Sequence, residues 1–151
     1  MSHLKPLLFA LALTLALFGC EQSKANKANQ PDVVNARLET GTSNSLIEQA
    51  FSQKQSNIQV NGSGLVVKLL ADDNKGARHQ KFLVKINAEQ TLLFAHNIDL
   101  APRVPLQTGD KISFRGEYVY NPKGGIIHWT HHAPKADHDA GWIMLNENKY
   151  Q

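Results

Sequence analysis

The fold is decided by the segment Lys111-Ile112-Ser113-Phe114-Arg115-Gly116-Glu117-Tyr118-Val119-Tyr120. Apolar and aromatic side chains alternate along it with Lys, Ser, Arg and Glu. Because successive side chains of a β-strand point to opposite faces of the sheet, this alternation predicts a strand with one buried face. Asn121-Pro122-Lys123-Gly124-Gly125 follows, and its turn residues predict a hairpin to the next strand.

Other segments with β patterning lie on both sides of this hairpin. The first covers residues 58–70, where Gly62 and Gly64 indicate a bulge or a sharp bend, as at the corner of a barrel. Turn residues separate the remaining segments and favour antiparallel connections between short strands. These further strands are expected over residues 81–86, 91–95, 126–132 and 142–145.

A short helix is expected ahead of the first strand. Ser45 and Glu48 have the spacing of a capping box, and apolar residues at helical spacing follow, which predicts a helix over residues 45–56. Together the elements predict a mainly β fold, a small OB-like antiparallel barrel of five to six strands with one N-terminal capping helix. A crossover with Pro102 and Pro105 takes the place of the helix that such barrels usually carry after the third strand.

Residues 1–19 have the features of a lipoprotein signal peptide. Lys5 supplies a positive charge, and the apolar run over residues 7–18 is too short to span a bilayer comfortably. The run ends in Leu17-Phe18-Gly19-Cys20, which resembles a bacterial lipobox, so Cys20 is the predicted lipidation site. The alternative is an ordinary cleaved signal with an incidental cysteine. Cys20 is the only cysteine, so the chain forms no internal disulfide.

Residues 20–44 are rich in polar side chains and predict a disordered tether, which leaves residues 45–151 as the barrel domain. The expected location is the bacterial cell envelope, with a membrane contact through the N-terminal lipid and the barrel facing the periplasm. Glu21 after the lipid cysteine does not resemble an inner-membrane retention signal, which favours the outer membrane.

The charge of the mature chain argues against duplex nucleic acid as a partner. Of 16 Lys and Arg residues, Lys5 lies in the signal peptide, so 15 basic side chains remain beside 13 acidic ones, a net charge of +2. No run of Lys or Arg forms a basic stripe. Binding of single strands through stacking stays open.

Several strings together resemble a known bacterial family. The most specific are Ala95-His96-Asn97-Ile98-Asp99-Leu100-Ala101-Pro102 and Ile127-His128-Trp129-Thr130-His131-His132. Asp72-Asp73 and Gly116-Glu117-Tyr118 add to them. Over about residues 62–151 the chain is similar to a family known as domain of unknown function 3465. The resemblance implies no activity, so a function must be inferred from the residues.

Four of the seven histidines lie within residues 128–138. In a continuous strand, His128, Thr130 and His132 would share the outer face, while Trp129 and His131 would point the other way, with Trp129 in the core. The following loop would return His138 to the same place. The predicted metal ligands are therefore His128, His132 and His138, which suit a divalent metal such as zinc. The alternative is a set of hydrogen-bonded structural histidines, or a solvated cluster.

Polar side chains near this strand form a predicted rim for a small ligand. Arg115 and Glu117 would flank His128 on the paired strand, and His96 would join them from the end of the third strand. Asn97 and Asp99 either belong to this rim or form hydrogen bonds with backbone groups of the crossover. The predicted ligand-binding residues are His96, Asn97, Asp99, Arg115, Glu117 and Thr130.

Three functions remain open. The leading hypothesis is a lipid-anchored envelope protein that binds a small ligand or divalent metal at the histidine strand without catalysis. The second is a metal-dependent phosphodiester hydrolase that uses Asp72 and Asp73 with Arg78 and His79, although an exposed turn explains the same residues. The third is a non-catalytic module that contacts another envelope protein. The sequence has no P-loop, nucleophile elbow or paired CxxC motif, so an enzyme is not favoured.

Overall fold

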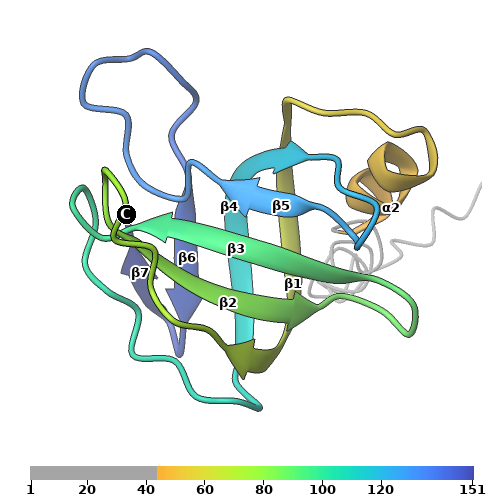
Figure 1. The fold of residues 1–151 in the computed structure, drawn as a ribbon, viewed down its shortest axis with the longest axis horizontal. Coiled ribbons are helices and arrows are strands. Elements are labelled where there is room, and N and C mark those ends of the chain that lie inside the picture. Colours follow the sequence, from red (N-terminus) through yellow and green to blue (C-terminus); the bar gives the residue numbers. More distant parts are fainter. Residues whose placement is uncertain (1–43) are drawn as a thin grey trace, which may run out of the picture. The chain divides into compact units, whose positions relative to one another are not determined.

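The computed structural model describes residues 44–151, which form a barrel with one short helix (Figure 1). The predictions for the signal peptide, the lipidated Cys20 and most of the tether lie outside the described residues. Within residues 44–151, no helix is long and apolar enough to cross a membrane. The elements are α2 (Ser45–Ser52), β1 (Ile58–Leu69), β2 (His79–Lys85), β3 (Thr91–Asn97), β4 (Lys111–Val119), β5 (Ile126–His128), β6 (Trp142–Leu145) and β7 (Asn148–Tyr150).

Five strands close the barrel in the order β1-β2-β3-β5-β4, because β1 also pairs with β4. Strands β6 and β7 extend the sheet from β4. The predicted OB-like barrel is confirmed, with one difference. Strand β5 pairs parallel to β3, so the barrel is mixed rather than wholly antiparallel. The reason is topological, since β5 returns from its hairpin with β4 and fills the gap between β4 and β3.

The first strand bends where the sequence predicts it. Residues 58–65 of β1 pair with β4, and its second half pairs with β2 after a register shift between Val66 and Lys68. A Cβ atom on Gly62 would lie 2.5 Å from the Phe114 ring, and one on Gly64 would lie 2.6 Å from the Lys85 carbonyl oxygen. Glycine is therefore required at both positions for the strands to approach each other.

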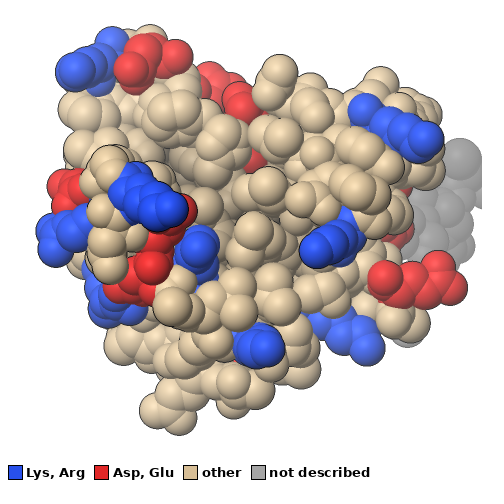
Figure 2. Space-filling view, viewed as in Figure 1, with Lys and Arg blue, Asp and Glu red and all other residues tan. Residues whose placement is uncertain are grey.

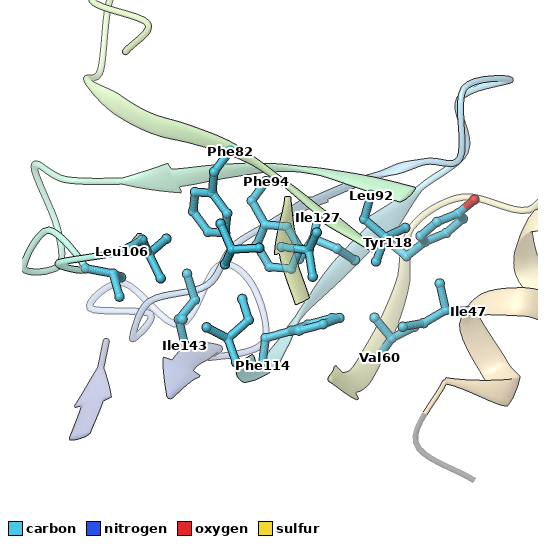
Figure 3. Packing of buried hydrophobic residues seen from close by; sticks show 14 of the residues in the cluster. Ile47, Val60, Phe82, Leu92, Phe94, Leu106, Phe114, Tyr118, Ile127 and Ile143 are labelled. Carbon is cyan, nitrogen blue, oxygen red and sulfur yellow. The ribbon is translucent and has the colours of Figure 1, made fainter. Parts of the chain in front are cut away.

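The core fills the barrel with aromatic and aliphatic side chains (Figure 3). The Phe94 ring stacks on Phe82 at 4.9 Å between centroids and meets the edge of Phe114 at 4.8 Å. Helix α2 buries Ile47 and closes one end of the barrel. Aromatic pairs of this kind stabilise a core beyond their buried area alone, by about 0.5–1.5 kcal/mol each.

The helix differs from its prediction at both ends. It stops at Ser52 rather than near residue 56. Asn44 rather than Ser45 is the N-cap residue. The Asn44 side chain exchanges two hydrogen bonds of 3.0 Å with the backbone of Ser63, so it joins the start of the helix to β1. The crossover over residues 98–110 contains no helix, as predicted.

Candidate functional site

The predicted histidine strand is interrupted at Trp129. Strand β5 ends at His128, and Trp129 has a φ angle of 52°, in the left-handed region. Because the alternation of side chains assumes an extended backbone, it does not continue past this residue. Thr130 and His131 are therefore both buried, with exposed fractions of 0 % and 1 %, while Trp129 is half-buried and His132 is exposed. The predictions that Thr130 lies on the outer face and Trp129 in the core are wrong.

Three of the four histidines gather around the indole of Trp129. The His138 ring stacks on it at 4.1 Å between centroids, and the His128 and His131 rings lie at 5.3 Å and 5.7 Å. Nδ1 of His138 donates a hydrogen bond to the Asp139 carbonyl, because a carbonyl oxygen only accepts. The loop after β5 is thus folded back onto Trp129 by ring contacts.

The predicted metal ligands are not brought together as a ligand set. His128 donates to the Glu117 carboxylate at 3.0 Å, His138 stacks on the indole, and His132 is exposed. Across residues 44–151 no group of three or more His, Cys, Asp or Glu side chains has an arrangement that would hold a metal ion. These histidines are close in the sequence, but their side chains do not point to a common centre, because the backbone turns at Trp129.

His96 and Thr130, which were predicted to line a ligand rim, are both buried and bond to each other. Nδ1 of His96 accepts from the Thr130 hydroxyl at 2.8 Å, and its Nε2 donates to the Pro102 carbonyl at 3.1 Å. Burial lowers the pKa of His96 from 6.5 to about 4. The neutral ring therefore ties β3 to the histidine segment and to the crossover, and offers nothing to a ligand.

Asn97 and Asp99 satisfy the backbone at the start of the crossover. The side-chain Oδ1 of Asn97 accepts from the Asp99 amide at 2.9 Å. Asp99 accepts at 2.7 Å from both the amide and the Nε group of Arg78. These hydrogen bonds from Arg78, first from its backbone and then from its side chain, lower the pKa of Asp99.

Arg115 and Glu117 stand on the outer face of β4. Glu117 lies opposite His128 in the strand register and contacts its ring, as the sequence predicts. Arg115 instead donates from Nε to the Ala140 carbonyl at 3.2 Å and so holds the end of the long loop. Of the predicted rim residues, Asp99 is exposed but paired with Arg78, while Arg115 and Glu117 are half-buried.

The acidic pair Asp72-Asp73 is split by the structure. Asp72 forms an ion pair with Arg103 of the crossover. Asp73 accepts at 3.1 Å from the Lys75 amide, a hydrogen bond that lowers its pKa and stabilises the turn. Asp73 and His79 line the same hollow, whereas Asp72 is paired with Arg103 and Arg78 with Asp99.

An apolar row crosses the outer face of the barrel. Leu83 of β2 is opposite Leu93 of β3, Leu93 is opposite Ile126 of β5, and Ile126 is opposite Val119 of β4. Directly opposed residues share a face of the sheet, so these side chains form a continuous strip. Their neighbours along each strand are fully buried, which shows that the strip faces outward. Outward positions of a half-buried sheet are usually polar.

Two hollows lie along this strip. The larger has a volume of about 540 Å³, an aliphatic floor that includes Leu83 and Leu93, and Lys68 and Lys123 in its lining. The smaller has a volume of about 320 Å³ and is lined by Ile126 and by polar side chains. In the view of Figure 1, in which β2, β3 and β5 are in front, the centre of this face is mainly uncharged, and basic and acidic side chains surround it (Figure 2). The full lining of the smaller hollow is Asp73, His79, Lys81, Ala95, Val119, Ile126 and His128.

Reasoning from the sequence did not single out this strip. The signal was present, because Leu83 and Leu93 occupy the outward positions of strands whose inward positions are also apolar. Only the register between strands shows that the outward residues are adjacent.

A family profile described as "Protein of unknown function (DUF3465)" matches residues 33–151. The chain belongs to the DUF3465 family. The resemblance stated from the sequence over about residues 62–151 is confirmed, and the match begins further upstream. No curated protein matches the chain. Because the DUF3465 description names no activity, a function has to be inferred from the outer face of the barrel.

Proposed function

We propose that this DUF3465 protein is a lipid-anchored protein of the bacterial cell envelope whose barrel binds a small apolar ligand on the outer face of β2, β3 and β5. The observation that carries the proposal is the outward strip from Leu83 to Val119 with the hollow of about 540 Å³ above it. The lipobox at Cys20 supports the location.

The position of the hollow agrees with the way this architecture is used. OB barrels bind their ligands on the face of the second and third strands, between the loops that follow the first and fourth strands. Lys68 and Leu70 lie where β1 passes into its loop, and Asn121 and Lys123 belong to the loop after β4. The face has no Phe, Tyr or Trp side chain in the lining of either hollow, so base stacking does not fit.

The proposal is one of binding rather than catalysis. The larger hollow is lined by aliphatic, amide, hydroxyl and lysine side chains, with no His, Cys or carboxylate among them. Burying a leucine side chain against an apolar ligand stabilises a complex by about 1.5–3 kcal/mol. An aliphatic floor of this kind therefore holds a ligand mainly by its apolar surface.

The uncharged dye N-phenylnaphthylamine tests the proposal, because its fluorescence rises in apolar sites. We expect the mature chain, with Cys20→Ser to avoid lipidation, to bind the dye, and Leu93→Ser to weaken binding about fivefold or more. Leu100→Ser is the matched control, since Leu100 is an exposed leucine outside the hollow. No dye binding, or equal binding by Leu93→Ser and wild type, would refute the proposed site.

A further inference from the structure

The larger hollow is electrostatically one-sided. Its lining contains two basic side chains, Lys68 and Lys123, and no acidic one. Lys68 is directly opposite Leu83, at the β1 edge of the apolar floor. Lys123 stands in the loop between β4 and β5, at the other edge. A ligand on the leucine floor would therefore lie between two cations.

Two acidic side chains near this hollow, Asp73 and Glu117, lie outside its lining and have partners. Asp73 lines the smaller hollow and accepts from the Lys75 amide. Glu117 accepts from the His128 ring. These carboxylates do not neutralise Lys123, so its positive charge is available to a ligand.

A second polar group accompanies Lys123. The side-chain Oδ1 of Asn121 accepts from the Lys123 amide at 2.8 Å, which fixes the Asn121 side chain in the lining of the hollow. Its Nδ2 group forms no hydrogen bond with other residues in the part of the chain that the structure describes. An ammonium group and an amide donor thus stand together at one edge of an aliphatic floor.

We propose that the ligand is a small amphipathic molecule with an anionic head group, dispersed in solution rather than part of a bilayer. Its apolar body lies on Leu83 and Leu93, and its head group contacts Lys123 and the amide of Asn121. This inference rests on the proposed function and adds the chemical class of the ligand. Lys68, at the far edge, contributes only a general attraction for the negative charge.

Displacement of N-phenylnaphthylamine by compounds with the same alkyl chain separates the head group from the apolar body. Decyl sulfate is anionic, decanol is uncharged and decyltrimethylammonium is cationic. We expect the mature chain with Cys20→Ser to bind decyl sulfate most tightly and the cation least tightly. Raised salt should weaken the binding of decyl sulfate more than that of decanol, because exposed ionic contacts are screened.

Lysine variants locate the head group. Lys123→Gln should weaken the binding of decyl sulfate about threefold to fivefold and leave the binding of decanol unchanged, as expected for one exposed ionic contact. Lys68→Gln should have a smaller effect. Lys111→Gln is the matched control, because Lys111 is exposed on β4 and lines neither hollow.

Three outcomes would overturn the inference. Equal affinity for decyl sulfate and decanol would contradict the inference that the ligand has an anionic head group. The proposed function would still stand if Leu93→Ser binds the dye more weakly than wild type. A loss in Lys68→Gln without one in Lys123→Gln would contradict the placement. If the protein sediments with anionic phospholipid vesicles and does not bind dispersed decyl sulfate, the face binds a membrane surface rather than a dispersed ligand.

Discussion

The described histidine rings mostly bond to groups of the protein itself. His96 is held between Thr130 and Pro102, and the His131 Nδ1 group donates to the His132 carbonyl at 2.7 Å. Burial also lowers the pKa of His131. For these two residues a structural role, which the sequence left open as an alternative, agrees best with their bonds.

His96 gives a prediction for stability against pH. Its folded-state pKa of about 4 lies below the ordinary value of 6.5. Between these pH values His96 is protonated in the unfolded chain and neutral in the folded chain. Stability is therefore complete above pH 6.5 and falls as the pH decreases towards 4. At 1.36 kcal/mol per unit, His96 contributes a loss of about 3 kcal/mol over this range.

Urea denaturation at a series of pH values measures this loss. His96→Gln should flatten the decline between pH 6.5 and about 4, whereas His132→Gln, which removes an exposed ring of the same segment, should keep the wild-type slope. An unchanged slope in His96→Gln would show that the buried histidine does not control acid stability.

At the scale of the elements, the alternation of apolar and polar side chains predicted the strands. It did not predict where the backbone leaves the extended conformation. The pattern of β4 and the glycines of β1 gave correct strands because their geometry depends on local residues. The left-handed Trp129 has no local signal, since it is neither glycine nor asparagine. The parallel pairing of β3 with β5 joins strands that are distant in the sequence. Because this pairing brings Leu93 beside Ile126, the apolar strip could not be predicted from the sequence either.

The hairpin between β4 and β5 depends on a glycine at position 125. Gly125 has a φ angle of 110°, and a Cβ atom there would lie 2.1 Å from the Tyr118 ring. Gly125→Ala should therefore destabilise the fold through both strain and overlap, by about 2–4 kcal/mol. Gly76→Ala is the matched control, with a φ angle of 75° and no atom within 4 Å, and should cost only about 1 kcal/mol.

The free energy of unfolding in urea distinguishes the two glycine variants. A larger loss in Gly125→Ala confirms that Tyr118 packs against the hairpin. Equal losses would mean that the ring moves aside without cost, and that the hairpin tolerates a side chain at this position.

At the scale of the whole molecule, the barrel closes on itself and leaves half-buried aliphatic side chains on the outer face of β2, β3 and β5. A closed barrel of strands has no need of a second layer over β2, β3 and β5, so an apolar strip there is not explained by folding alone. The N-terminal region carries the separate proposal of a lipid anchor at Cys20, which would tether the chain to a membrane.

Lipidation at Cys20 is a prediction for cells. Full-length chain expressed in bacteria with an alkyne-labelled fatty acid should incorporate the label and fractionate with membranes. Cys20→Ser should lose the label, because the thiol that would carry the lipid is absent. Labelling of Cys20→Ser, or release of unlabelled wild type into the soluble periplasm, would contradict the proposed anchor.

The central claim is that the outer face of β2, β3 and β5 is the binding site, and chemical-shift mapping tests it most directly. Isotope-labelled mature chain with Cys20→Ser is titrated with decyl sulfate, and the amide and methyl signals are followed by NMR. We predict that the largest shifts occur at Leu83, Leu93 and Lys123, with little change around Trp129. Shifts concentrated on Trp129 and His138, with Leu83 and Leu93 unaffected, would place the binding site elsewhere and contradict the account.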